Sequence, residues 1–123
     1  MQAPLRILTV DDESSITLSL RFVFSDPHYE LTCVDSGKAA LAKLNSNSEL
    51  YDVIIVDEKM PNMTGVELVG LIRQREIKGK IVVVSAHLNT AIRQAYKRLG
   101  VQLLFSKPFN VEELRNAIDR IAA

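Results

Sequence analysis

The sequence predicts an α/β fold built on a parallel β-sheet, and three observations support this prediction. Short apolar runs alternate with amphipathic stretches along the chain, as in repeated strand–helix units. Most of these runs are apolar at nearly every position, which suits parallel strands covered on both faces. The chain has 123 residues, of which 47% are hydrophobic. This length and composition suit a single domain with a packed core over residues 1–123.

Five apolar runs are predicted strands, and polar or turn residues bound each of them. In chain order they cover residues 5–10, 31–34, 53–56, 81–84 and 101–105. Several of them are rich in valine and isoleucine, which favour strands. We therefore expect five strands, with helices in the connections between them.

Helix signals lie in these connections. Thr64 precedes an amphipathic stretch with Glu67 three positions later, which is typical of an N-cap with a reciprocal glutamate. Asn110 and Glu113 repeat this spacing before the last helix. The apolar residues of that helix recur three or four positions apart, at Val111, Leu114, Ile118 and Ile121. Two glycines, Gly79 and Gly100, mark predicted turns or helix ends.

Charge and cysteine content exclude several classes of protein. Lys and Arg number 15 and Asp and Glu number 15, so no overall positive field attracts nucleic acid or acidic lipid. The single cysteine, Cys33, cannot form an internal disulfide, which fits a reducing compartment. The sequence also lacks a signal-peptide pattern and a long apolar segment. We therefore expect a cytoplasmic protein without direct membrane contact.

Polar groups follow four of the predicted strands. The segments are Asp11-Asp12-Glu13, Asp57-Glu58-Lys59, Ser85-Ala86-His87 and Ser106-Lys107-Pro108. In an open parallel sheet, ligands bind beyond the carboxyl ends of the strands, near the point where the strand order reverses. Asp35 follows the second strand, which we place at the outside of the sheet, so no role is expected for it.

The aspartates at these strand ends predict a metal site. If the first and third strands are neighbours, about 4.8 Å apart, Asp11, Asp12 and Asp57 converge. Two like charges about 4 Å apart repel by about 4 kcal/mol at an effective dielectric constant of about 20, so the cluster needs a cation or protons. Oxygen ligands favour Mg²⁺, Mn²⁺ or Ca²⁺. A magnesium site keeps waters that phosphate oxygens can replace, and Lys107 and Ser85 can contact those oxygens.

Each of these residues also has a plainer interpretation. Asp12 or Glu13 can simply favour a helix N-terminus, and a lone aspartate such as Asp57 is often a turn residue. Lys107 and Ser85 can belong to a surface loop or a turn. The site hypothesis depends on their joint occurrence, because chance would place some of them at the opposite edge of the sheet.

At these residues the chain resembles the response-regulator receiver domain of two-component signalling, of the chemotaxis-regulator-like kind, over essentially its whole length. Asp11-Asp12 is similar to the family's acidic pair, and Asp57 to its phosphoacceptor aspartate. The segment Lys-Met-Pro-Asn-Met-Thr-Gly at 59–65 is similar to the family's loop after the third strand. Ser85 is similar to the serine or threonine switch position. Lys107-Pro108-Phe109 is similar to the Lys-Pro-Phe segment, whose Lys-Pro bond is commonly cis.

The resemblance implies a flavodoxin-like, doubly wound sheet of five parallel strands in the order 2-1-3-4-5, with helices on both faces. It implies that Asp57 accepts a phosphoryl group from a sensor histidine kinase or a histidine phosphotransfer protein. The reaction would depend on Mg²⁺, with Mn²⁺ as an alternative ion. The implied metal ligands are Asp11, Asp12, Asp57 and the backbone carbonyl of Lys59. Lys107 and Ser85 would contact the phosphoryl group.

A protein of this kind is a signalling phosphoacceptor rather than an enzyme, although it takes part in its own phosphorylation and autodephosphorylation. Lys59 and His87 correspond to variable positions at the mouth of the family's site. Our hypothesis is that they adjust the lifetime of the phosphoaspartate; the alternative is that both are ordinary surface residues.

The output side of the domain departs from the family pattern. The family often has an aromatic residue three positions before the lysine, where this chain has Leu104. Phe105 is its neighbour, and successive strand side chains point to opposite faces, so Phe105 is not expected to substitute. The surface of the fourth helix, fifth strand and fifth helix is a candidate site for a downstream protein, an attached output domain or a homodimer. Tyr96 is either a contact there or part of the packing.

Three alternatives remain open. The first is a phosphorylation-independent pseudo-receiver that acts as a docking module; Mg²⁺-dependent binding of beryllofluoride, a phosphoryl mimic, would argue against it. The second is an aspartyl phosphatase, but no second aspartate stands two positions after Asp57. The third is a flavin or dinucleotide binder, but no glycine-rich loop follows the first strand.

Overall fold

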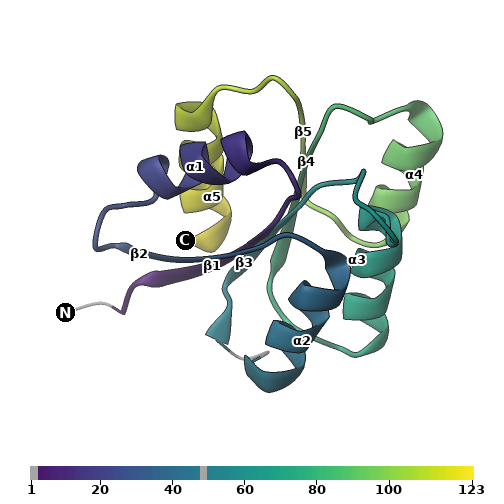
Figure 1. The fold of residues 1–123 in the computed structure, drawn as a ribbon, viewed down its shortest axis with the longest axis horizontal. Helices are drawn as coiled ribbons and strands as arrows, with labels where there is room; N and C mark the ends of the chain where they lie inside the picture. Colours follow the sequence, from purple (N-terminus) through teal and green to yellow (C-terminus); the bar gives the residue numbers. More distant parts are fainter. Residues whose placement is uncertain (1–2, 48–49) are drawn as a thin grey trace.

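The computed structural model describes residues 3–47 and 50–123, and it confirms the predicted α/β fold. Strands and helices alternate in five successive pairs, which Figure 1 shows in sequence colours. Their bounds are β1 Leu5–Val10, α1 Ser14–Val23, β2 Tyr29–Val34, α2 Gly37–Asn47, β3 Val53–Val56, α3 Gly65–Gln74, β4 Lys80–Ser85, α4 Thr90–Arg98, β5 Leu103–Ser106 and α5 Val111–Ala122.

The five strands form one sheet in the order β2-β1-β3-β4-β5, and all neighbours are parallel. This is the order that the resemblance implied. The chain runs from β1 outward to β2 and then crosses back to β3 on the other side of β1. The strand order therefore reverses between β1 and β3, which is where such sheets bind ligands.

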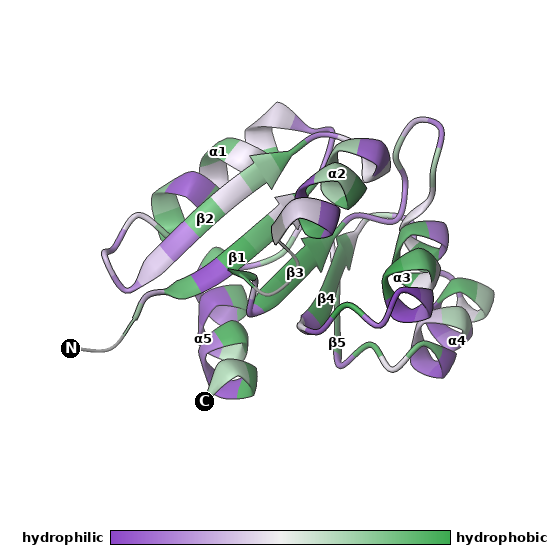
Figure 2. Cartoon of the chain, turned by 90° about the horizontal axis from the view of Figure 1, so that it is seen from below, coloured by the Kyte–Doolittle hydropathy of each residue, from purple (hydrophilic) through white to green (hydrophobic). Residues whose placement is uncertain are grey.

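Helices cover both faces of the sheet (Figure 1): α1 and α5 lie on one face, and α2, α3 and α4 on the other. Alternate residues of β1 supply the two halves of the core. Leu8 and Val10 pack with the layer of α2, α3 and α4, whereas Ile7 packs with α1 and α5. All four residues of β3 are buried. Figure 2 shows β1, β3 and β4 as mainly hydrophobic, as expected for strands covered on both faces.

β5 and β2 begin two residues away from the sequence-based expectation, whereas both ends of β4 and the end of β5 differ from it by one residue. β5 begins at Leu103 rather than at residue 101. Gly100 has a φ of 73°, and the amide of Val101 donates to the carbonyl of Tyr96 at 3.1 Å, so these residues terminate α4 instead of pairing in the sheet. β2 begins at Tyr29, two residues earlier than predicted.

The predicted helix N-caps are confirmed. Thr64 forms a full capping box with Glu67 at the start of α3. Asn110 accepts from the amides of Glu112 and Glu113 at the start of α5. The predicted reciprocal bond from a glutamate side chain forms at Thr64 and, within the described part of the chain, not at Asn110. No helix in residues 3–47 and 50–123 is long and apolar enough to cross a membrane.

Candidate functional site

Asp11 and Asp57 lie side by side at the carboxyl edge of the sheet because β1 and β3 are paired. Val10 is opposite Val56 in the register, and the amide of Asp57 donates to the carbonyl of Val10 at 3.0 Å. Asp12 follows Asp11 in the chain. One carboxylate oxygen from each of the three aspartates lies within 4.8 Å of the others. The predicted convergence of the three carboxylates is confirmed.

The three aspartates differ in their exposure to solvent. Asp11 and Asp57 have exposed fractions of 5% and 3%, whereas Asp12 is exposed. An open hollow of about 480 Å³ between α1 and β2 is lined by Asp11 and Asp12. A small ion or ligand can therefore reach the cluster from the side of Asp12.

One oxygen of Asp57 lacks a protein partner. Oδ1 is buried, and within the described part of the chain it makes no hydrogen bond. About 90% or more of buried polar groups in folded proteins have a partner. A cation beside Oδ1 would satisfy it, and Asp11 and Asp12 add the oxygen ligands that Mg²⁺ prefers. The residues present therefore fit a hard divalent cation.

Lys107 supplies the positive charge at this edge of the sheet. It follows β5, its side chain is 8% exposed, and its bond to Pro108 is cis. Its Nζ donates to Asp11 Oδ2 at 2.9 Å, to Glu13 Oε1 at 2.9 Å and to Asp57 Oδ2 at 3.3 Å. The lysine thus bridges the ends of β1 and β3 from β5.

Burial, hydrogen bonds and neighbouring charges shift the pKa values of two groups in the cluster. Burial raises the pKa of Asp11, and the nearby charge of Asp57 adds to this, against hydrogen bonds from the Glu13 amide and Lys107. Burial alone would lower the pKa of Lys107, but its bonds to Asp11 and Glu13 outweigh burial and raise it. The lysine therefore stays protonated, and the cluster retains excess negative charge that a cation would neutralise.

Ser85 is completely buried at the end of β4. Its Oγ accepts a hydrogen bond from the amide of His87 at 3.2 Å, and its backbone carbonyl accepts from the amide of Lys107 at 3.0 Å. The serine thus lies at the same edge as the aspartates and is joined through the backbone to the lysine.

Lys59 and His87 lie in the loops after β3 and β4, and both are exposed. Within residues 3–47 and 50–123, neither side chain forms a hydrogen bond or ion pair with the three aspartates. Their predicted effect on the site stays a prediction.

Leu104 and Phe105 of β5 point to opposite faces of the sheet, as predicted. Leu104 packs with the layer of α2, α3 and α4, whereas Phe105 packs with α1 and α5. Tyr96 belongs to the first of these layers and is completely buried. The suggestion that Tyr96 is a contact on the surface of α4, β5 and α5 is therefore wrong, because its ring packs inward between α4 and the sheet.

Two glutamates at the site were not recognised from the sequence as functional. Glu13 was considered only as a helix-cap residue, yet its carboxylate bonds Lys107. Glu58 directly follows Asp57, is 7% exposed, and accepts a hydrogen bond from the Tyr96 hydroxyl at 2.5 Å. Burial and this bond raise the pKa of Tyr96. The only signal in the sequence was their place beside the aspartates.

The five-stranded parallel sheet and the acidic cluster at its carboxyl edge are those expected of a receiver domain, and comparison with known proteins gives the same class. The sequence profile of the response regulator receiver domain matches residues 7–119. The chain belongs to this family.

The chain is similar to several characterised proteins. It is 29% identical over 115 residues to sporulation initiation phosphotransferase F of Bacillus subtilis, covering 94% of this chain and 91% of that protein. It is 31% identical over 109 residues to the response regulator ArlR of Staphylococcus saprophyticus, covering 89% of this chain and 48% of ArlR. The chain therefore spans about half the length of ArlR.

Solved structures show the same fold. The chemotaxis protein CheY4 of Vibrio cholerae superimposes with a TM-score of 0.87 at 32% identity, covering 97% of this chain and 99% of that one. A CheY-like receiver domain protein from Methanospirillum hungatei gives a TM-score of 0.89 at 24% identity, covering 97% and 94%.

Proposed function

We propose that this domain accepts a phosphoryl group on Asp57 from a phosphohistidine of a sensor histidine kinase or a histidine phosphotransfer protein, in a Mg²⁺-dependent reaction. The observation that carries the proposal is the buried Oδ1 of Asp57, which lies beside Asp11 and Asp12 and has no hydrogen-bond partner among residues 3–47 and 50–123, while Lys107 bonds the other oxygen. Membership of the receiver family supports the same reaction.

Asp57 acts as the nucleophile. A carboxylate oxygen bonds to phosphorus while the phosphorus–nitrogen bond of the phosphohistidine breaks, and that electron pair remains on the imidazole nitrogen. Asp11, Asp12, Asp57 and the backbone carbonyl of Lys59 would hold Mg²⁺, which supplies positive charge against the developing charge of the phosphoryl oxygens. Mn²⁺ could take the same place because it also prefers oxygen ligands.

Lys107 and Ser85 contact the transferred group in this proposal. Lys107 exchanges its 3.3 Å contact with Asp57 Oδ2 for a phosphoryl oxygen, and keeps Asp11 as a second partner. The Ser85 hydroxyl donates to another phosphoryl oxygen after a local movement. The added charge thereby changes the ends of β4 and β5, which adjoin α4 and α5.

The face formed by α4, β5 and α5 is the proposed output surface. A downstream protein, an attached output domain or a second copy of the chain would bind there according to the phosphorylation state. Relatives such as ArlR extend beyond the region that this chain matches.

Residues 1–123 would act as one receiver domain, and the free, half-buried Cys33 thiol is compatible with the cytoplasm. The domain would lose its phosphoryl group by autodephosphorylation, with Lys59 and His87 as modulators of the rate. A phosphorylation-independent docking module is a weaker alternative, because it has no use for three converging carboxylates and a lysine around an Asp57 oxygen that lacks a hydrogen bond within the described residues.

The test is labelling with a small phosphodonor, such as acetyl phosphate, with and without Mg²⁺. We expect Mg²⁺-dependent, acid-labile label on the wild type and none on Asp57→Asn. Asp35→Asn is the matched control, because Asp35 also follows a strand but lies at the outer strand β2, and it should label normally. Retention of the label on Asp57→Asn would refute the assignment, and Mg²⁺-dependent binding of beryllofluoride would argue against a mere docking module.

A further inference from the structure

Tyr96 of α4 and Glu58 form a buried hydrogen bond next to the phosphoacceptor. The tyrosine is completely buried and the glutamate is 7% exposed. The phenol donates to Glu58 Oε1 at 2.5 Å. Because Glu58 follows Asp57 directly in the chain, this bond joins α4 to the segment that carries the nucleophile.

Glu58 is fixed from a second side by the start of α3. The same Oε1 accepts from the amide of Val66 at 3.0 Å, and the backbone carbonyl of Glu58 accepts from the amide of Gly65 at 2.8 Å. A carboxylate at a helix N-terminus is stabilised by the free amides and the helix dipole. The side chain and the backbone of Glu58 are therefore both held.

The packing at this junction leaves little room for movement. A Cβ atom on Gly65 would lie 2.2 Å from the Tyr96 hydroxyl oxygen and 2.7 Å from the backbone carbonyl oxygen of Asp57. The phenol, the start of α3 and the Asp57 backbone thus meet around a residue without a side chain. The phenol therefore lies close to the backbone that carries the Asp57 carboxylate.

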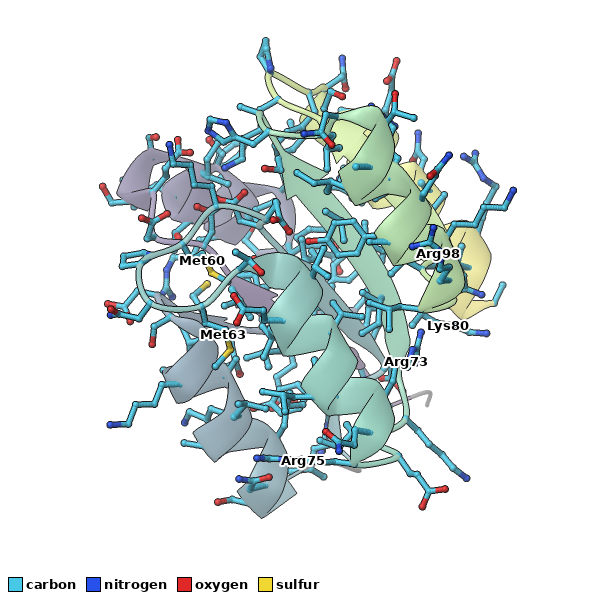
Figure 3. All side chains as sticks on the ribbon, turned by 90° about the vertical axis from the view of Figure 1, so that its right-hand side faces the viewer. Met60, Met63, Arg73, Arg75, Lys80 and Arg98 are labelled. Carbon is cyan, nitrogen blue, oxygen red and sulfur yellow. The ribbon has the colours of Figure 1, made fainter. Side chains whose placement is uncertain are left out.

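A contact between α3 and the end of α4, made by Arg73, lies away from this junction. Arg73 donates from Nε to the carbonyl of Leu99 at 2.8 Å, at the end of α4. Figure 3 shows α3 and α4 side by side, with Arg73 far along α3 from the loop that carries Met60 and Met63. Arg73 therefore ties the helices together, whereas Tyr96 reaches the Asp57 segment.

We propose that Tyr96 is a positioning residue for phosphoryl transfer, which acts through Glu58 to hold Asp57 in its reactive orientation. Packing alone does not require this pair, since a phenylalanine would fill the same space and an apolar residue would avoid the cost of burying a carboxylate. The inference rests on the proposed function. It also makes α4 and Asp57 mutually dependent, because a coupling between two sites acts equally in both directions.

The experiment compares initial rates of labelling by acetyl phosphate at saturating Mg²⁺. Tyr96→Phe keeps the ring and removes the donor, and we expect about a tenfold lower rate, within the roughly hundredfold that a misplacement of about 1 Å can cost. Glu58→Gln keeps an oxygen acceptor for both donors and should retain most of the rate. Glu58→Ala removes the acceptor of both donors and should be at least as slow as Tyr96→Phe, and the double variant should be no slower than Glu58→Ala alone.

Tyr29→Phe is the matched control for the loss of a phenol–carboxylate bond. Tyr29 donates to Asp119 at 2.7 Å, on β2 and α5 and remote from the aspartates, so its loss should leave the labelling rate unchanged. Thermal midpoints of both phenylalanine variants separate a loss of stability from a loss of rate.

The possible results separate a failure of the proposed function from a failure of this inference. A wild type that takes no label would overturn the proposed function and this inference with it. A labelled wild type with an equal rate for Tyr96→Phe would overturn the inference alone. Additive losses in Tyr96→Phe and Glu58→Ala would also overturn it, since the two residues would then act independently. If Glu58→Ala fails to fold, the labelling rates of the other two variants test the inference. A lower rate for Tyr96→Phe than for Glu58→Gln supports it, and equal rates overturn it.

Discussion

Lys107 contacts only one of the two carboxylate oxygens of Asp57. Its Nζ lies 3.3 Å from Oδ2, while Oδ1 is buried and, in the described part of the chain, without a hydrogen-bond partner. The lysine is closer to Asp11 and Glu13, at 2.9 Å from each. This asymmetry leaves Oδ1 of Asp57 for a further ligand, whereas Oδ2 stays within reach of the Lys107 ammonium.

We expect Lys107→Met to destabilise the domain in Mg²⁺-free buffer. The substitution leaves two buried carboxylates without their counter-charge, and breaking a buried pair in this way costs about 3 kcal/mol or more. Urea denaturation monitored by circular dichroism measures the loss. Added Mg²⁺ should recover part of it, because a ligand that binds only the folded state stabilises that state.

Lys97→Met is the control for Lys107→Met, because Lys97 is exposed on α4 and should change the free energy of unfolding by less than about 0.5 kcal/mol. An equally small change for Lys107→Met would show that the ammonium does not compensate the aspartates.

Gly65→Ala should destabilise the domain by about 2 kcal/mol, as overpacking of a buried site does. The added Cβ would lie 2.7 Å from the Asp57 backbone carbonyl, which cannot rotate away as a side chain can. Gly70→Ala in the same helix is the opposite case, since a Cβ there meets nothing within 4 Å. It should stabilise α3 by up to about 1 kcal/mol. Denaturant unfolding of both variants checks the contrast, and equal effects would contradict it.

Tyr29 should titrate abnormally at high pH. Burial and its hydrogen bond to Asp119 raise the pKa of Tyr29 from 10.0 to about 12. Between these values the folded chain keeps a proton that the unfolded chain loses, so the free energy of unfolding falls as the pH rises through this window. The difference in tyrosinate absorbance between wild type and Tyr29→Phe isolates this group. A midpoint near 10.0 would contradict the raised pKa.

Lys59→Ala and His87→Ala should each shorten the lifetime of the phosphoaspartate severalfold. Both side chains are exposed in the loops after β3 and β4, and if they cover the phosphoaspartate as proposed, their removal would admit water more readily. Loss of acid-labile label after removal of the phosphodonor gives the rate. Lys78→Ala, in the exposed turn before β4, is the control. Rates equal to that of the control would reduce both residues to ordinary surface positions.

Much of the site could be predicted from the sequence because a parallel sheet brings the carboxyl ends of its strands to one edge. Apolar runs located β1 and β3 to within a few residues, so Asp11 and Asp57 had to lie at that edge. The position of Lys107 at the end of β5 followed in the same way. These predictions depend on strand ends, which short-range patterns determine well.

The junction of Tyr96 and Glu58 depends on long-range geometry instead. The rotation of α4 about its axis decides whether Tyr96 faces solvent or the core, and that rotation is set by packing against the sheet. An acidic residue in a loop is usually exposed, so burial of Glu58 by a tyrosine 38 positions away had no local signal. The start of β5 was misplaced for a related reason, since Val101 is apolar but belongs to the turn that terminates α4.

The bond between Lys107 and Asp11 also bears on how the chain folds. The two residues are 96 positions apart, so the neutralising lysine arrives only when β5 has joined the sheet. Until then, the paired ends of β1 and β3 hold carboxylates whose mutual repulsion opposes their association. A divalent cation present during folding would neutralise these carboxylates before β5 joins the sheet. We therefore expect Mg²⁺ to accelerate refolding as well as to stabilise the folded domain.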